Sequence, residues 1–178
     1  MHATTYANSN YGRTCLDAMS RHHAGRILLP EPVTLAALEA YAKPIPENLT
    51  GTGLVLLVDD EEMVLRLTGT ILERNGYRVI TALNGHIGIE QVRDYREQLA
   101  LVILDLVMPV MGGVQAFAGI KAIAPRLPVI LMTGYDPHES AGRFEEGALA
   151  GFIHKPGLVP DLLRTVKAAM RKQNGDLN

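Results

Sequence analysis

The sequence predicts an α/β domain with a doubly wound, five-stranded parallel sheet, helices on both faces of the sheet and an N-terminal extension. Two observations support this fold class. Apolar strand-like runs alternate with helix-like segments, and four of the five runs are apolar at nearly every position, as buried parallel strands are. The five runs are 54–58, 77–81, 101–105, 127–132 and 150–154.

The first strand is expected at 54–58, and the segment after it has the apolar periodicity of a helix. The apolar residues that share one helical face there are Val64, Leu67, Ile71 and Leu72. The pair Asn75-Gly76 beyond them is a helix stop signal. The next run, 77–81, alternates between polar and apolar residues, which is typical of a strand at the edge of a sheet.

The last helix is expected to begin near Pro160 and Asp161, because both residue types are favourable at a helix start. Its apolar stripe consists of Leu162, Leu163, Val166 and Met170. Ligands of doubly wound sheets bind beyond the carboxyl ends of the strands. The residues that follow the five runs are therefore the candidate functional residues.

Residues 1–50 are predicted to form the N-terminal extension, and residues 51–178 the domain. The first part of the extension is rich in Asn, Ser, Thr, Gly and His without a sustained period, which indicates a partly disordered segment. The apolar segment 33–42 can form a short helix, and two prolines then interrupt regular structure before the first strand.

The composition argues against several classes of function. The chain has 178 residues and a formal net charge of -2, and neither predicted part has the basic excess of a nucleic-acid binder. No apolar run approaches the roughly 20 residues that a membrane span needs. The N-terminal residues also lack the apolar core of an export signal, so we expect a cytoplasmic protein without direct nucleic-acid or membrane contacts.

Polar side chains stand at the ends of four of the predicted strands: Asp59 and Asp60, Asp105, Thr133, and Lys155. One such aspartate alone is usually a turn former or a helix N-cap. Three carboxylates at one sheet edge, however, repel one another by about 4 kcal/mol per pair at about 4 Å and an effective dielectric of about 20. A hard divalent cation removes this repulsion, and Mg²⁺ fits best because it prefers oxygen ligands and retains waters.

Asp105 can also act as a nucleophile, because a carboxylate with an ordinary pKa of about 3.9 is ionised at neutral pH. Its attack on a phosphoryl donor would give an acyl phosphate. Lys155 can offer positive charge and Thr133 a hydroxyl donor to the phosphoryl oxygens. Lys155 alone would be interpreted as a solvated surface lysine, but the combination predicts a Mg²⁺-dependent phosphoryl acceptor.

Four strings stand at these strand ends: LVDDEE, ILDLVMPVMGG, LMTGY and GFIHKP. In order and spacing they resemble the receiver domains of response regulators in two-component signal transduction, over essentially all of residues 54–172. The resemblance implies a CheY-like, flavodoxin-like fold with the strand order 2-1-3-4-5. It also implies a phosphoprotein of a phosphorelay rather than an enzyme, limited to self-phosphorylation from a donor and slow autodephosphorylation.

The resemblance implies a role for each residue of the metal site. Asp105 would be phosphorylated and, together with Asp60, would contact Mg²⁺ directly. Asp59 would act on the metal mainly through water. The backbone carbonyl of Val107 would add a further ligand.

The resemblance implies a conformational switch as well. Thr133 and Lys155 would bind the phosphoryl group, and the ring of Phe152 would turn inward as Thr133 moves toward the phosphate. The peptide bond before Pro156 would be cis. Phe152 on its own would be interpreted as a core aromatic residue.

The implied partners are a histidine kinase or a histidine phosphotransfer protein, and a downstream protein target that the sequence does not identify. A homodimer through the fourth helix, the fifth strand and the fifth helix of the domain stays open. The cognate kinase, the pathway and the stimulus also stay open.

Three other interpretations compete with this one. The chain could be a detached C-terminal receiver of a hybrid histidine kinase, because residues 25–30 resemble the last strand of a kinase ATP-binding domain. An aspartyl-phosphate hydrolase of the haloacid-dehalogenase type would need a second aspartate where Val107 stands. A flavodoxin-like phosphate binder is disfavoured because the acidic residues 59–62 would repel the phosphate.

Overall fold

The computed structural model describes residues 49–135, 142–155 and 157–175 of the chain. These residues form a five-stranded sheet in which all paired strands are parallel and the order is β2-β1-β3-β4-β5. The strands are β1 Leu54–Val58, β2 Arg78–Ala82, β3 Leu99–Asp105, β4 Val129–Thr133 and β5 Gly151–His154. The predicted fold class and strand order are therefore confirmed.

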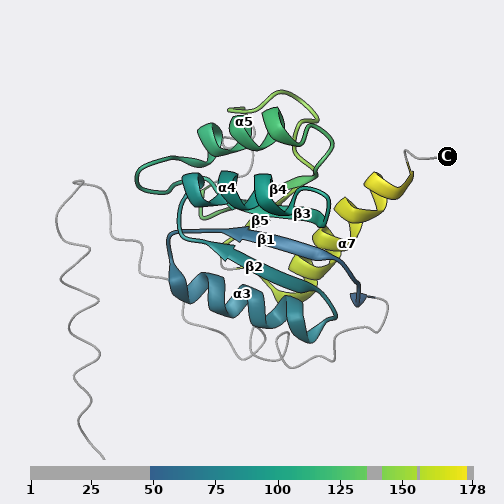
Figure 1. Ribbon diagram of the computed structural model, residues 1–178. Helices are drawn as coiled ribbons and strands as arrows, with labels where there is room; N and C mark the ends of the chain where they lie inside the picture. The colour runs from purple at the N-terminus through teal and green to yellow at the C-terminus, as the bar shows by residue number, and fades with distance from the viewer. Residues whose placement is uncertain (1–48, 136–141, 156, 176–178) are drawn as a thin grey trace, which may run out of the picture.

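Helices cover both faces of the sheet (Figure 1), and their bounds are α3 Glu62–Arg74, α4 Gly85–Tyr95, α5 Gly113–Ile123 and α7 Val159–Gly175. Residues of α3 and α7 build the apolar layer on one face, and residues of α4 and α5 build the layer on the other. No helix within the described residues is long and apolar enough to cross a membrane.

The burial of each strand agrees with its place in the sheet, and the start of the fourth strand agrees with the proline before it. All residues of β1 and β4 are buried, whereas most of β2 at the sheet edge is partly exposed, in agreement with its alternating sequence. The fourth strand begins at Val129 rather than at residue 127. Pro128 lacks a backbone N–H and so cannot donate to the ladder, although its carbonyl accepts a bond of 3.0 Å from Val102 N–H.

The face that α3 turns toward the sheet differs from the predicted one. The helix buries Leu65, Thr68, Gly69 and Leu72. Of the four apolar residues expected to share a face, Leu72 is fully buried but Leu67 is 63% exposed. The apolar stripe of α3 is thus wider than the sheet can cover, and part of it lies open at the surface. The stripe of α7 is confirmed at its buried residues Leu162, Leu163 and Val166.

The connection between β4 and β5 packs against α5. The described parts of this connection, residues 134–135 and 142–150, contain turns and bends but no helix or strand. Phe144 in this stretch makes an edge-to-face ring contact with Phe117 of α5, at a centroid distance of 5.1 Å and an interplanar angle of 80°. The fourth helix that the resemblance implies is not found within residues 142–150, and residues 136–141 lie outside the described part of the chain.

The chain joins the domain at the C-terminal end of α3. Leu49 is 8% exposed and belongs to the apolar layer of α3 and α7. Gly51 N–H donates to the carbonyl of Asn75 at 3.0 Å, and the Lys167 ammonium donates to the carbonyl of Thr50 at 3.1 Å. The division at residue 51 stays a prediction, and the short helix predicted over 33–42 lies outside the described residues.

We expect the apolar layer of α4 and α5 to respond to the loss of a single buried side chain. Val92 of α4 is fully buried, so Val92→Ala should lower the free energy of unfolding by about 2 kcal/mol through lost burial and a residual cavity. Val114 of α5 is 39% exposed, and Val114→Ala should change it by less than about 0.5 kcal/mol. Urea unfolding of both variants measures the difference, and equal values would contradict the packing described above.

Candidate functional site

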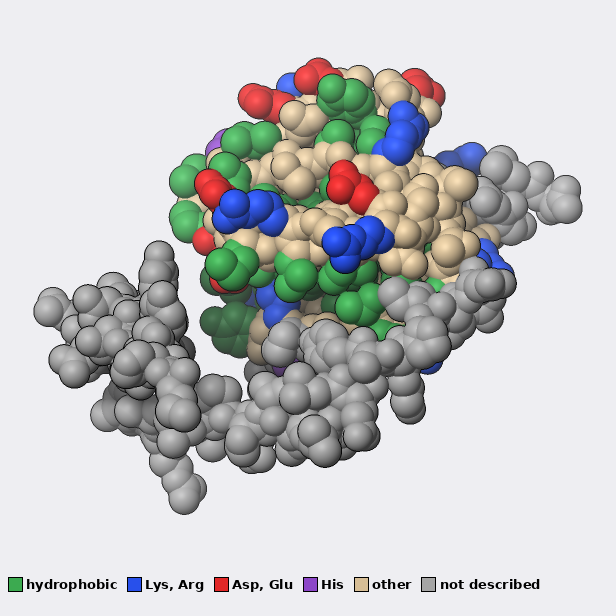
Figure 2. Space-filling view, turned by 90° about the horizontal axis from the view of Figure 1, so that it is seen from below, with side chains coloured by type: hydrophobic (Ala, Val, Ile, Leu, Met, Phe, Trp, Pro, Cys, Tyr) green, Lys and Arg blue, Asp and Glu red, His purple; other side chains and the backbone are tan. Residues whose placement is uncertain are grey.

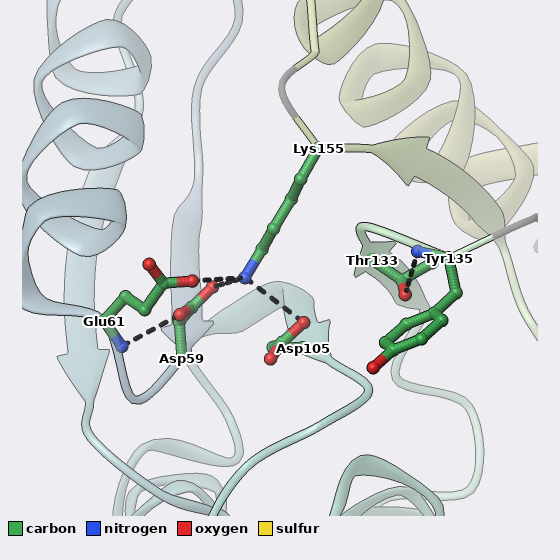
Figure 3. A network of polar contacts seen from close by, with 6 residues as sticks. All are labelled: Asp59, Glu61, Asp105, Thr133, Tyr135 and Lys155. Carbon is green, nitrogen blue, oxygen red and sulfur yellow. Dashed lines mark hydrogen bonds and ion pairs between the residues drawn. The ribbon is translucent and has the colours of Figure 1, made fainter. Parts of the chain in front are cut away.

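The carboxyl ends of four strands meet at one edge of the sheet and bring the predicted residues together (Figure 3). Asp59 follows β1, Asp105 ends β3, Thr133 ends β4 and Lys155 follows β5. One carboxylate oxygen from each of Asp59, Asp60 and Asp105 lies within 4.8 Å of the other two. Parallel strands place these ends on one side because all of them run in the same direction.

Lys155 extends from the end of β5 into the group of carboxylates (Figure 3). Its ammonium nitrogen lies 2.6 Å from Asp59 Oδ2 and 3.2 Å from Asp105 Oδ1. A longer contact of 3.6 Å joins it to Glu61 Oε1. Only 18% of the Lys155 side chain is exposed, so these pairs are shielded from solvent more than surface ion pairs are. Lys155 is therefore not a solvated surface lysine but a member of the carboxylate group that the combination of strand ends predicts.

Asp59 is fully buried and uses its two carboxylate oxygens differently. Its Oδ1 accepts a hydrogen bond of 3.0 Å from the backbone N–H of Glu61, just before α3 begins. Its Oδ2 lies 2.6 Å from the Lys155 ammonium, which is its ion-pair partner. A buried carboxylate is tolerated when a positive charge pairs with it, and Lys155 provides that charge here.

The donor set fits a hard divalent cation. The three aspartates and Lys155 carry a net charge of -2 when all are ionised, and oxygen atoms are the ligands that Mg²⁺ prefers. Asp60 is exposed at the mouth of the group, which leaves room for metal-bound waters. Val107 follows two residues after Asp105, and the metal contact of its backbone carbonyl stays a prediction.

Burial and neighbouring charges shift the pKa of Asp105 and the pKa of Lys155. Burial raises the pKa of Asp105, and Asp59 raises this pKa further, while Lys155 opposes both effects. Burial alone would lower the pKa of Lys155, but Asp59 and Asp105 outweigh it and raise the pKa. Lys155 is therefore charged at neutral pH, and additional positive charge among the carboxylates would favour ionised Asp105.

Thr133 and Phe152, the two predicted switch residues, lie on neighbouring strands. Thr133 is 1% exposed, and its Oγ1 accepts a hydrogen bond of 3.1 Å from Tyr135 N–H. Phe152 is half-buried on β5, in register with Leu131 of β4. Lys155 N–H donates to the carbonyl of Thr133 at 2.8 Å, so the end of β4 is joined directly to the residue that reaches the carboxylates. The coupling of Thr133 to Phe152 stays a prediction, and Pro156 lies outside the described residues.

The first residue of α5, Gly113, has a role that the sequence interpretation missed. A Cβ atom at Gly113 would overlap the carbonyl oxygen of Asp105, so only glycine lets the start of α5 come this close. Gly113 N–H donates to the carbonyl of Leu106 at 2.9 Å. In the loop before α5, Val110 is 84% exposed and adopts a positive φ of 69°, which is strained for a β-branched residue. The Gly112-Gly113 pair in the sequence was the available signal.

Glu61 is the second residue that was missed. The sequence interpretation treated it only as part of an acidic run that repels phosphate. In the structure its backbone N–H is held by Asp59, and its carboxylate lies 3.6 Å from the Lys155 ammonium. The Glu61 side chain is 64% exposed, so it contributes a solvent-screened charge at the rim of the site.

Comparison with known proteins agrees with this geometry. A family model for the response regulator receiver domain matches residues 55–167. Transcriptional regulatory protein GlrR of Escherichia coli (strain K12) is 38% identical over 57% of this chain and 22% of that protein. Sensor kinase CckA of Brucella abortus (strain 2308) is 32% identical over 71% of this chain and 13% of that protein. The chain thus spans a small part of these two relatives.

A smaller relative and a solved structure match over nearly their whole length. Polar-differentiation response regulator DivK of Brucella anthropi is 27% identical over 64% of this chain and 93% of that protein. A CheY-like receiver domain protein from Methanospirillum hungatei has a TM-score of 0.65 and 27% identity, with coverage of 71% of this chain and 99% of that chain. With the sheet order, the acidic group and the family match in agreement, the chain belongs to the response regulator receiver domain family.

Proposed function

We propose that this chain accepts a phosphoryl group on Asp105 in a Mg²⁺-dependent reaction and then acts as a conformational switch in a phosphorelay. The donor would be a histidine kinase or a histidine phosphotransfer protein, the partners that a receiver domain implies. The observation that carries the proposal is the convergence of Asp59, Asp60 and Asp105 around an ion-paired lysine. This arrangement combines a nucleophile, a metal-binding donor set and a fixed positive charge.

In the proposed reaction a carboxylate oxygen of Asp105 forms a bond to phosphorus while the bond from phosphorus to the donor atom breaks. Mg²⁺ would supply Lewis-acid charge stabilisation to the phosphoryl oxygens, held by Asp59, Asp60 and Asp105. Lys155 already lies 3.2 Å from Asp105 Oδ1 and can shift its contact to a phosphoryl oxygen. The product is an acyl phosphate on the side chain of Asp105.

The proposed switch starts at Thr133. Its hydroxyl already accepts a hydrogen bond from Tyr135 N–H, and the hydroxyl proton is available for donation to a phosphoryl oxygen. A shift of Thr133 toward Asp105 would open space beside β4 for the ring of Phe152, which is half-buried before the change. The surface around β5 would then differ between the two states.

One observation favours the alternative of a receiver derived from a hybrid kinase. The match to sensor kinase CckA covers 71% of this chain, although it involves only 13% of that kinase. This alternative leaves the chemistry at Asp105 unchanged and alters only the source of the phosphoryl group. The haloacid-dehalogenase alternative lacks support, because Val107 cannot transfer a proton. Cytoplasmic location and a homodimer through the surface around β5 stay predictions.

Phosphorylation should depend on one carboxylate. We expect acetyl phosphate and Mg²⁺ to add about 80 Da to the intact chain, the mass of one phosphoryl group bound through an acyl phosphate. Asp105→Asn should abolish this addition because the amide is not a nucleophile. Asp94→Asn removes an exposed carboxylate of α4 and should leave the addition unchanged. Mass spectrometry of the intact protein measures it, and a phosphorylated Asp105→Asn variant would refute the assignment.

Magnesium should stabilise the folded chain through the same carboxylates. At a concentration of about 100 times its Kd, Mg²⁺ should raise the free energy of unfolding of the wild type by about 2.7 kcal/mol. Asp60→Ala should lose this gain because an exposed ligand is missing, yet in EDTA it should be as stable as the wild type or more so, since a like charge is gone.

Urea unfolding in Mg²⁺ and in EDTA measures the free energy of unfolding of each variant under both conditions. Glu146→Ala is the control, because it removes an exposed acid from the β4–β5 connection. The control should keep the full magnesium effect. A marked loss of stability for Asp60→Ala in EDTA would show that this acid serves the fold instead of a metal.

The acyl phosphate should be long-lived. Val107 and Tyr135 are large side chains near Asp105 and Thr133 with exposed fractions of 52% and 58%, and they can shield the phosphoryl group from water. Replacing both by Asn should accelerate autodephosphorylation about tenfold, equivalent to about 1.4 kcal/mol of barrier. The decay of the phosphorylated mass over time measures this rate, and an unchanged decay in the double variant would exclude shielding by these residues.

A further inference from the structure

An apolar groove of about 360 Å³ opens between α3 and α7, beside the candidate site. Glu61 and Lys155 lie at its site end. The rest of its wall is formed mainly by apolar side chains of the two helices: Val64, Leu67, Ile71, Val159 and Leu162. The groove therefore continues from the carboxylates along the surface of α3.

One exposed apolar residue of α3, Leu67, lines this groove, and a second, Met63, lies one turn away from it. Leu67 is 63% exposed, and Met63 one turn earlier is 74% exposed. Residues four positions apart lie on the same side of a helix, so these two side chains form one stripe. Viewed from the side that carries α3, the surface shows hydrophobic side chains gathered between charged ones (Figure 2). Binding of an apolar segment over this stripe would remove exposed apolar surface from water, which is favourable.

The N-terminal extension joins the domain on the same face. Leu49 is buried in the apolar layer that α3 and α7 share, and Gly51 N–H bonds to the carbonyl of Asn75 at the end of α3. The groove lies along the same helix, toward its other end. The chain before Leu49 is therefore tethered to the groove's distal end, away from the carboxylates.

We propose that residues 33–42 of this chain dock in the groove between α3 and α7. This segment contains Leu35, Leu38 and Tyr41 and a single charged residue, Glu39, so its composition matches the apolar wall. The six residues between it and Leu49 reach up to about 20 Å when extended. Ten helical residues are about 15 Å long, comparable to the stretch of α3 from Ile71 to Glu61.

The tether favours this segment over a second copy of the chain. A short linker gives a docked segment an effective concentration in the millimolar range, which an unlinked copy reaches only at similar protein concentration. The docked segment would then lie beside Glu61 and Lys155, which line the end of the groove nearest the carboxylates. Docking itself does not depend on phosphoryl transfer, and its test needs no phosphodonor.

The rate of thiol modification at Leu67 tests the docking. In the full chain with Cys15→Ser, Leu67→Cys provides one thiol in the groove, and its reaction with an aromatic disulfide reagent gives its accessibility. Adding Leu35→Asp and Leu38→Asp places two charges on the docking segment and should release it. We expect the thiol at position 67 to react about tenfold faster once the two aspartates release the segment. This factor corresponds to an effective concentration of the segment in the millimolar range and a Kd for docking about ten times lower.

A matched thiol on the opposite face controls for general effects. Asp94→Cys on α4, in the same Cys15→Ser background, should react at the same rate with and without the two aspartates. Equal rates at position 67 in both backgrounds would overturn the docking. Protection at position 67 that disappears on tenfold dilution would also overturn it, because it would identify a second copy of the chain as the occupant. None of these outcomes depends on Asp105 accepting a phosphoryl group.

Discussion

The ammonium of Lys155 is the interaction on which the site depends, because it stands among carboxylates that would otherwise repel one another. Asp59 is fully buried, and a buried charge is tolerated only when it is paired or bound to a metal. Lys155 provides this pairing from β5, although β3 and β4 separate that strand from β1. One positive charge cannot balance three negative ones, so the remaining charge favours a divalent cation.

The close approach of α4 and α5 to the sheet depends on glycine. In isolation Gly88 would be expected to weaken α4 by about 1 kcal/mol relative to alanine. In the structure a Cβ at Gly88 would lie 3.0 Å from Val58 Cγ2, so the missing side chain lets the helix pack against β1. Gly113 plays the same part where α5 begins beside Asp105. Residues that reduce helix propensity thus set the distance between the helices and the strand ends.

Much of the fold could be predicted from the sequence because parallel strands buried on both faces are apolar throughout, as β1 is. The candidate site could be predicted in the same way, because the carboxyl ends of parallel strands lie at the same edge of the sheet. Burial around α3 could not be predicted, because Leu67 and Leu72 are chemically equal and only packing leaves one exposed. Glu61 was missed for a similar reason: its contact with Lys155 depends on three-dimensional proximity, which sequence spacing does not contain.

The ring contact between Phe117 and Phe144 joins α5 to the β4–β5 connection outside the sheet. Phe144 lies on the segment that leaves β4 after Thr133, and Phe117 lies on the helix that begins beside Asp105. The ring contact therefore joins the helix that begins beside Asp105 to the connection that follows Thr133. Loss of either ring would remove this edge-to-face contact between α5 and the β4–β5 connection.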